Sequence, residues 1–160
     1  MEGKSVNEKE KLLTELNRNL ELLLADERNM IANLANASAL LFNSLPDINW
    51  SGFYLLNGDE LVLGPFQGKP ACVRIPVGKG VCGTAFQDRK TYVVPDVHEF
   101  PGHIACDEAS QSEIVVPIII EGKPVGVMDL DSPIKSRFDE IDQKYLEEFV
   151  KILIGKTDFI

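Results

Sequence analysis

The sequence lacks any long uninterrupted hydrophobic run. Its longest apolar stretches, such as residues 114–120, are far shorter than the roughly 20 residues that cross a bilayer as a helix. The N-terminal segment MEGKSVNEKEK is polar and contains no apolar signal region. We therefore expect a soluble, cytoplasmic protein.

Positive charge is also scarce. The formal net charge is −9, and no segment concentrates Lys and Arg. A surface that binds the phosphates of nucleic acid carries a basic patch, so the composition argues against a nucleic-acid partner.

Internal repeats and low-complexity linkers are absent as well. A chain of 160 residues has the length of one domain. A domain of this size buries roughly 70% of the surface of its unfolded chain, so its core needs no disulfide. We expect a single domain over residues 1–160, with an N-terminal helix within residues 1–27 and the core in residues 28–160.

Three amphipathic helices are expected. Between residues 8 and 25, leucines recur at helical spacing among charged residues. A second helix begins at about Arg28, and Leu45-Pro46-Asp47 supplies its stop. A third covers residues 138–153.

Strands are expected between the second and third helices. Asn57-Gly58 predicts a hairpin between residues 50–56 and 60–63. Further strands are expected over residues 71–77, 91–94, 114–120 and 124–130, the last two being central because they are almost continuously hydrophobic. Helices segregated from an antiparallel sheet define an α+β domain.

A glycine-rich turn, Gly78-Lys79-Gly80-Val81-Cys82-Gly83, matches the G-x-G-x-x-G pattern of dinucleotide sites. The helix expected after it, residues 81–89, is short, and the next acids come too early to contact a ribose. We interpret the motif as a tight turn that presents Cys82 at a helix N-terminus, where the helix dipole favours a thiolate.

The three cysteines, Cys72, Cys82 and Cys106, fall within 35 residues and match neither a zinc ribbon nor a secreted disulfide framework. They could be small buried hydrophobic residues, the commonest fate of a free cysteine. They could equally carry thiol chemistry, in which two pair at a time and one is a nucleophile.

The long loop of residues 96–109 has no hydrophobic periodicity and is long enough to be a lid or a site. His98 and His103, with Cys106 and Cys82, could in principle bind zinc, although H-x4-H-x2-C is not a usual spacing. Thiol chemistry fits better, because a mobile loop can carry Cys106 between a substrate and a second cysteine.

Polar and aromatic residues on the expected strands suggest a pocket. Asp129 and Asp131 are two residues apart, so they share one face of a strand. If Glu113 lies opposite them, repulsion and burial would raise at least one carboxyl pKa and create a proton donor. Trp50 and Tyr54 share a face of the first strand, either as core residues or as an aromatic wall.

Four motifs occur together in this chain: R-I-P-V-G-K-G-V-C-G-T-A (residues 74–85), D-V-H-E-F-P-G-H-I-A-C-D (96–107), S-E-I-V-V-P (112–117) and G-V-M-D-L-D-S (126–132). With them the chain, from about residue 30 onward, resembles the free methionine-(R)-sulfoxide reductases, which are single GAF domains. The resemblance implies a sheet with the N-terminal and C-terminal helices on one side and a loop-lined ligand pocket on the other.

The resemblance also implies roles for the candidate residues. Cys106 matches the attacking cysteine, Cys82 the resolving cysteine, and Cys72 a further thiol for disulfide exchange. The acids Glu113, Asp129 and Asp131 match those that hold the substrate, and the aromatic wall is matched by Trp50 and Tyr54. No bound cofactor or metal is implied. Reducing equivalents would come from thioredoxin, ultimately from NADPH, and members are often homodimers.

The chemistry of the residues agrees with a reductase that forms a cysteine sulfenic acid and then an intramolecular disulfide. The alternative is a non-catalytic GAF module that binds a small molecule or senses oxidants. Reduction of free methionine-(R)-sulfoxide would distinguish the two hypotheses.

Overall fold

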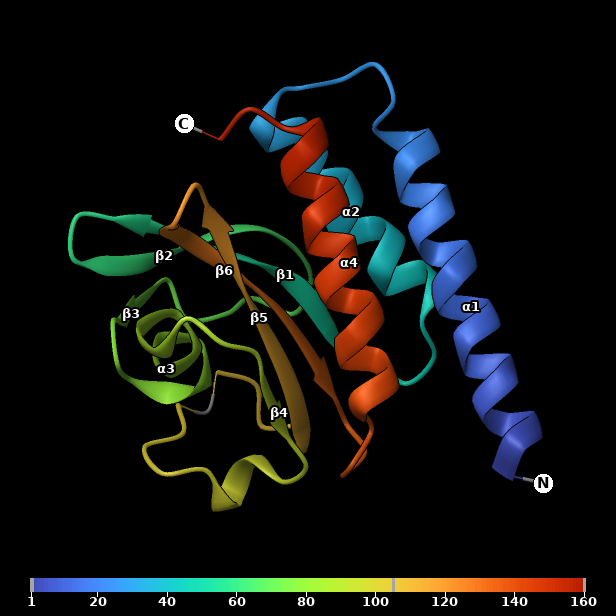
Figure 1. Cartoon of the computed structure of the whole chain (residues 1–160). Coiled ribbons are helices and arrows are strands. Elements are labelled where there is room, and N and C mark those ends of the chain that lie inside the picture. The colour runs from blue at the N-terminus through green and yellow to red at the C-terminus, as the bar shows by residue number, and fades with distance from the viewer. Residues whose placement is uncertain (1, 105, 160) are drawn as a thin grey trace.

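The computed structural model describes residues 2–104 and 106–159. Its elements, in chain order, are α1 (Glu2–Leu23), α2 (Met30–Ser44), β1 (Trp50–Asn57), β2 (Glu60–Gly68), β3 (Arg74–Pro76), α3 (Gly80–Asp88), β4 (Tyr92–Val94), a 3-10 turn η1 (Val97–Glu99), β5 (Ser112–Ile120), β6 (Lys123–Ser132) and α4 (Glu140–Lys156) (Figure 1).

The strands form one sheet in the order β3-β2-β1-β6-β5-β4, and each pair of neighbouring strands is antiparallel. The hairpin β1–β2 and the two strands that form the hairpin β5–β6 were expected from the sequence. Strands β1 and β6 lie side by side at the centre of the sheet, so residues far apart in the sequence meet there. The α+β prediction is confirmed.

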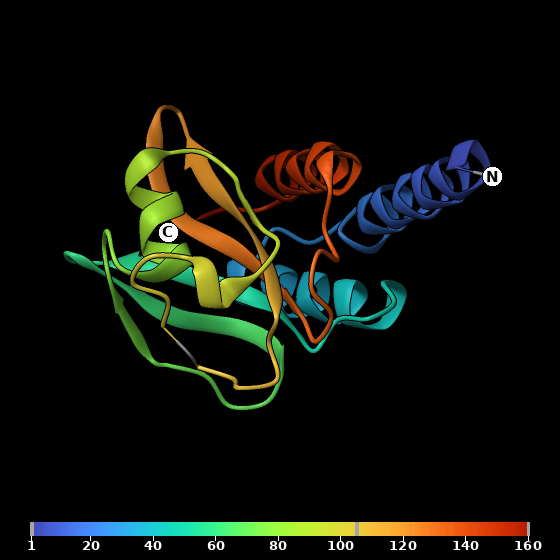
Figure 2. The ribbon, with the colours of Figure 1, turned by 90° about the horizontal axis from the view of Figure 1, so that it is seen from below.

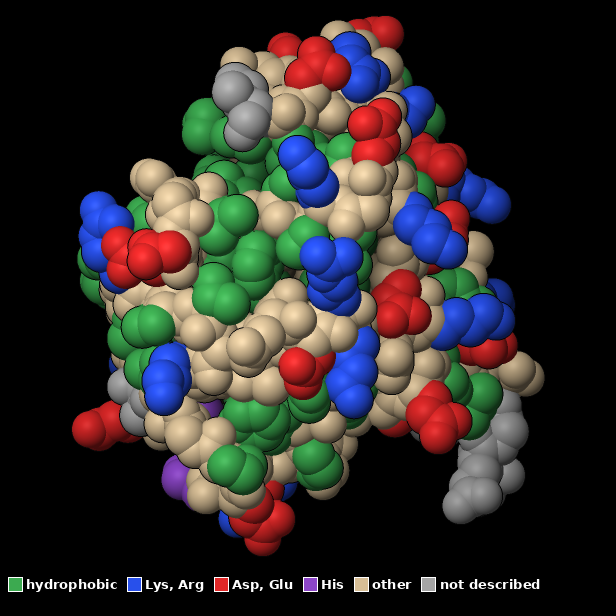
Figure 3. Space-filling view, turned by 60° about the vertical axis from the view of Figure 1, so that its left-hand side comes forward, with side chains coloured by type: hydrophobic (Ala, Val, Ile, Leu, Met, Phe, Trp, Pro, Cys, Tyr) green, Lys and Arg blue, Asp and Glu red, His purple; other side chains and the backbone are tan. Residues whose placement is uncertain are grey.

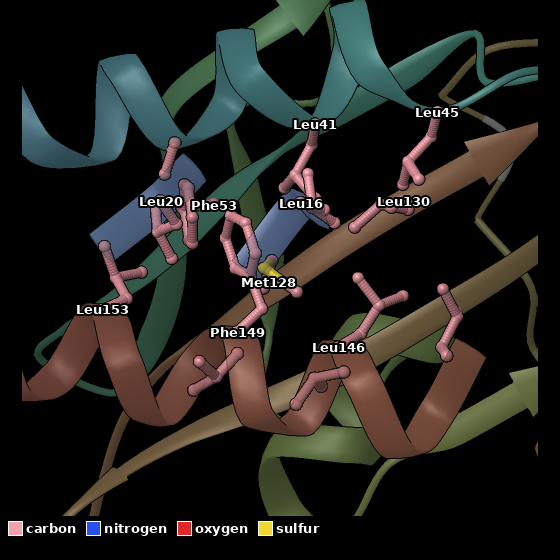
Figure 4. Close-up of a cluster of buried hydrophobic side chains, with 14 of the residues drawn as sticks. Leu16, Leu20, Leu41, Leu45, Phe53, Met128, Leu130, Leu146, Phe149 and Leu153 are labelled. Carbon is pink, nitrogen blue, oxygen red and sulfur yellow. The ribbon is translucent and has the colours of Figure 1, made fainter. Parts of the chain in front are cut away.

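One face of the sheet is covered by α2 and α4, and α1 packs against these two helices (Figure 2). The larger hydrophobic core lies in this layer, and Figure 4 shows leucines of the helices packed against Phe53 and Met128 of the sheet. The side chains of Leu16 and Leu20 on α1 are almost fully buried, so the leucine stripe of the N-terminal helix faces the core.

The opposite face is covered by α3 and by the loops around it (Figure 2). A second, smaller hydrophobic cluster fills this layer and includes Trp50, Tyr54, Ile75 and Cys82. The chemistry-bearing residues of the sequence are therefore gathered on this face.

The expected boundaries of two strands were wrong. The strand expected over residues 71–77 is limited to Arg74–Pro76, while β2 extends to Gly68, beyond the predicted end at residue 63. The connection over residues 69–73 has no regular hydrogen-bond pattern.

The loop of residues 96–109 contains the short turn η1, which Asp96 caps by accepting a hydrogen bond from the His98 main chain.

Acidic and basic side chains intermingle on the face shown in Figure 3. No helix among the described residues is both long enough and apolar enough to cross a membrane.

Candidate active site

The register of the central strands brings the three predicted acids together. Glu113 on β5 is paired directly with Asp131 on β6, and Asp131 is paired on its other side with Trp50 on β1. Asp129 lies two residues before Asp131 and therefore on the same face of the sheet. Glu113 therefore lies directly opposite Asp131, as the sequence analysis supposed, whereas the residue directly opposite Asp129 is Val115.

These acids are removed from water. Glu113 is 7% exposed and Asp129 is 5% exposed, while Asp131 is partly buried. Burial raises the pKa of all three carboxyl groups well above the ordinary range, and repulsion between neighbouring acids raises each pKa further. The pocket therefore favours carboxylic acids that keep a proton near neutral pH.

One buried oxygen in this cluster has no partner. The Oδ1 atom of Asp129 makes no hydrogen bond with the part of the chain that the structure describes. A buried polar group without a partner is costly, so this oxygen favours a ligand with a complementary polar group.

An aromatic wall borders the acids. The rings of Trp50 and Tyr54 are stacked with their centroids 5.9 Å apart, and the ring of Phe66 also stacks with Trp50 at 5.2 Å. Both Trp50 and Tyr54 are 2% exposed and line the pocket. Their shared face was expected from their spacing on the first strand.

Two of the cysteines form a disulfide. Cys72 and Cys106 are joined, with their Cα atoms 5.4 Å apart, and Cys106 lines the pocket. The resemblance instead gave Cys82 as the resolving cysteine and Cys72 as an additional thiol. The pairing in the structure gives Cys72 the position of the partner to Cys106.

Cys82 is a buried free thiol on the floor of the pocket. Its Sγ lies 4.0 Å from Oε2 of Glu113, to which it donates. Burial, followed by the nearby charges of Asp129 and Glu113, raises the pKa of Cys82 well above that of an ordinary thiol. The expectation of a thiolate at this helix N-terminus was therefore wrong, because burial and acidic neighbours outweigh the helix dipole.

The histidines do not gather around a metal. His98 is exposed and lies 2.9 Å from the carboxylate of Asp96, whereas His103 lines the pocket and has a pKa lowered by burial. Within the described residues, the group that could hold an ion consists of Cys82, Glu113 and Asp129. The zinc set suggested by the sequence, with both histidines, is not assembled.

Sequence reasoning missed the contribution of Asn49, which precedes β1. Its Nδ2 donates to Oδ2 of Asp107 at 3.0 Å and to Oγ of Ser110 at 3.1 Å. These bonds connect the end of the loop that carries Cys106 to the start of β1. Asp107 also accepts from the main chain of Ala109, an Asx-type turn that the sequence Asp107-Glu108-Ala109 could have indicated.

Comparison with known proteins gives the class of the fold. The model of the GAF domain family matches residues 14–153, and the chain belongs to this family.

The chain is 51% identical to the free methionine-R-sulfoxide reductase of Escherichia coli (strain K12), with 94% of this chain and 93% of the relative covered. The structure of the fRMsr of Staphylococcus aureus in complex with substrate has a TM-score of 0.87 and 57% identity, covering 90% of this chain and 94% of that chain. The substrate complex of free methionine-R-sulfoxide reductase from Neisseria meningitidis has a TM-score of 0.90 and 48% identity, covering 92% and 89%. The resemblance drawn from the sequence motifs is confirmed.

Proposed function

We propose that this chain reduces the R epimer of free methionine sulfoxide to methionine. The observation that carries the proposal is the Cys72–Cys106 disulfide at a pocket that is also lined by three acids, two of them buried. A thiol and a proton donor are the two groups that reduction of a sulfoxide requires. Relatives that share about half of the sequence and carry the name of this activity support the same conclusion.

In the first step, the thiolate of Cys106 attacks the sulfur of the sulfoxide. A bond forms between the two sulfur atoms, and a carboxylic acid of the cluster protonates the sulfoxide oxygen. The oxygen is then transferred as hydroxyl to the sulfur of Cys106, as its bond to the substrate sulfur and the new sulfur–sulfur bond both break. Methionine leaves with its sulfur reduced by two electrons, and Cys106 is oxidised to a sulfenic acid. The raised pKa values of Glu113, Asp129 and Asp131 support the role of proton donor, because an ordinary carboxyl group has lost its proton at neutral pH.

In the second step, the thiol of Cys72 attacks the sulfenic sulfur of Cys106. A sulfur–sulfur bond forms, the sulfur–oxygen bond breaks, and the oxygen leaves as water. A dithiol protein must then reduce the disulfide by exchange, and thioredoxin is the donor that we propose. Cys72 and Cys106 are both partly exposed, which supports access by such a donor. This cycle suits the reducing cytoplasm.

The acids also explain selection of a free amino acid. The α-ammonium group of free methionine sulfoxide can pair with one ionised carboxylate while another acid keeps its proton. A peptide has converted this ammonium group to an amide and would leave the buried carboxylate without its partner charge. The stacked rings of Trp50 and Tyr54 give the uncharged part of the substrate an apolar contact.

We further propose that the protein acts as a homodimer.

The direct test is incubation of the protein with dithiothreitol and racemic methionine sulfoxide, followed by chiral chromatography. We expect selective loss of the R epimer and formation of methionine. The Cys106→Ser variant should form no methionine. Survival of both epimers with the wild-type protein would refute the activity and favour a non-catalytic GAF sensor.

The roles of the other cysteines are tested with thioredoxin, thioredoxin reductase and NADPH as the reducing system. The Cys72→Ser variant should release about one methionine per subunit and then stop, because its sulfenic acid has no partner for a disulfide. The Cys82→Ser variant should continue beyond the first methionine. The reverse result would make Cys82 the resolving cysteine.

A further inference from the structure

The segment that carries Cys72, residues 69–73, is held in place by residues of the pocket rather than by regular secondary structure. It begins after Gly68, whose φ of +130° is a conformation that other residues rarely adopt. A Cβ atom on Gly68 would lie 2.7 Å from Cδ1 of Trp50 and 2.8 Å from the main-chain oxygen of Asn49. The chain therefore leaves β2 in close contact with Trp50.

The far end of the segment is fixed to the sheet. The main-chain N–H of Leu63 on β2 donates to the carbonyl oxygen of Val73 at 2.8 Å. Pro70 lies between the two anchored ends, and its ring restricts φ. The conformational freedom of the residues around Cys72 is reduced from both sides.

Two buried side chains bind the carbonyl groups between these ends. The indole Nε1 of Trp50 donates to the carbonyl oxygen of Lys69 at 3.2 Å, and the hydroxyl of Tyr54 donates to the carbonyl oxygen of Cys72 at 2.8 Å. Both donors come from β1, at the centre of the sheet. The Tyr54 bond is made to the residue that supplies one sulfur of the disulfide.

The Tyr54 hydroxyl keeps its proton over the range of pH in which the protein can work. Burial, followed by the charge of Asp129, raises the pKa of this phenol far above its usual value. The hydroxyl is therefore a permanent donor, and its bond to the Cys72 carbonyl is independent of the protonation of the pocket acids.

We propose that Tyr54 is a positioning residue for disulfide closure: its hydroxyl, assisted by the indole of Trp50, holds the segment of Cys72 where this thiol can reach the sulfenic acid on Cys106. The proposal deepens the proposed function and rests on it. The covalent step is the one given above, in which Cys72 sulfur displaces the oxygen of Cys106 as water. Fixing the attacking sulfur raises its effective concentration, which is the usual gain from orientation.

The same side chain thus serves both steps through different atoms. The ring of Tyr54 belongs to the aromatic wall of the pocket, while the hydroxyl reaches the resolving cysteine. Tyr54→Phe separates the two, because it keeps the ring and removes only the hydroxyl. Tyr92→Phe is a matched control, since the hydroxyl of Tyr92 is bonded to Asp88 at the protein surface.

The experiment isolates closure from substrate binding. Reduced protein is oxidised with one equivalent of hydrogen peroxide, so that any sulfenic acid on Cys106 forms without methionine sulfoxide. The 1,3-diketone dimedone is present at a fixed concentration, and mass spectrometry gives the ratio of diketone adduct to Cys72–Cys106 disulfide. This ratio depends on how fast Cys72 closes the disulfide relative to capture.

For Tyr54→Phe we expect the ratio of adduct to disulfide to rise roughly fivefold, as loss of a hydrogen bond worth about 1 kcal/mol implies. Tyr92→Phe should match the wild type. The disulfide of Tyr54→Phe should also be easier to reduce, by about 20 mV for a fivefold change in the equilibrium constant. An unchanged adduct ratio in Tyr54→Phe would overturn the proposal, as would an equal increase in Tyr92→Phe.

A parallel sample contains methionine sulfoxide in place of peroxide and is analysed for methionine. If the wild type releases none, the proposed function fails, whatever the peroxide experiment gives. If the wild type releases methionine while the adduct ratio of Tyr54→Phe is unchanged, only the positioning role fails. The two failures are therefore distinguishable.

Discussion

At Glu113, Asp129 and Asp131, the sheet holds three carboxyl groups in a setting that favours their neutral forms. Burial and mutual repulsion both act against ionisation, and the nearby Cys82 is kept as a thiol by the same causes. The unfolded chain lifts these constraints and lets the same carboxyl groups ionise at their ordinary pKa of about 4. Folding and proton binding are therefore linked at this site.

This linkage predicts a pH-dependent effect of Glu113→Gln. Below the ordinary carboxyl pKa both states are protonated, and the stability that depends on the protonated form is fully present. As the pH rises, the unfolded state loses the proton of Glu113 first, so the free energy of unfolding falls until the folded pKa is passed. The glutamine side chain does not ionise, so the Glu113→Gln variant does not show this fall in the free energy of unfolding. Relative to wild type, the variant should therefore gain free energy of unfolding as the pH rises from 4 to 8.

Urea denaturation at both pH values gives the measurement. Asp59→Asn, at the exposed turn between β1 and β2, is the control and should have the same small effect at both. If Glu113→Gln changes the free energy of unfolding equally at pH 4 and pH 8, the raised pKa is disproved.

For individual residues, the spacing of Asp129 and Asp131 was enough to predict that they share one face of the strand, because side chains alternate along a strand. The pairing of Cys106 with Cys72 was beyond the reach of such local rules. It depends on the path of residues 69–73, which Gly68 and two side chains of β1 determine from a distance.

Among the elements, α3 is set against the sheet by a very close contact. A Cβ atom on Gly83 would lie 2.5 Å from the main-chain oxygen of Pro76 on β3, and Gly83 donates its own N–H to Lys79 within the turn that starts the helix. Because Cys82 precedes Gly83, the position of this helix fixes the thiol on the pocket floor. The glycine-rich motif thus serves close packing, in agreement with the interpretation of a tight turn.

The effect of alanine should therefore differ between two helical glycines. Gly83→Ala should lower the free energy of unfolding by about 1–3 kcal/mol, because the main chain of Pro76 must move to accept the methyl group. Gly155→Ala, at an exposed position of α4 with nothing near its would-be Cβ, should raise it by roughly 0.5–1 kcal/mol. Urea denaturation measures both. A stabilising effect of Gly83→Ala would show that α3 has room to shift.

The predicted elements were most accurate where their own residues determine them. Asn57-Gly58 located the first hairpin, and the leucine stripe located the N-terminal helix. The strand predicted over residues 71–77 failed in its first half because β2 pairs with β3 only over Glu60 to Val62, and the carbonyl groups of Lys69 and Cys72 are taken by side chains instead. Periodicity contains no information about such partners.

In the whole molecule, the sheet separates a helical layer from the layer that contains the pocket. The N-terminal helix α1 is part of the first layer through Leu13, Leu16 and Leu20. Lys9 on the same helix adds an ion pair of 2.6 Å with the buried Asp142 on α4. Phe53 extends from the central strand into this layer, while its neighbour Tyr54 faces the pocket. Packing in the helical layer is therefore connected to packing in the pocket layer through β1.

A single cooperative unit follows from this arrangement, and Leu16→Ala tests it. Leu16 is 1% exposed, so its truncation should lower the free energy of unfolding by about 2–5 kcal/mol. Trp50, the one tryptophan of the sequence, reports on the opposite layer by fluorescence, while far-ultraviolet circular dichroism follows the helices. Both signals should shift to lower urea together. Leu22→Ala, on the same helix but 71% exposed, should change little. Loss of helical signal with an unchanged Trp50 transition would instead make α1 an independently unfolding segment, and the pocket layer would not depend on it.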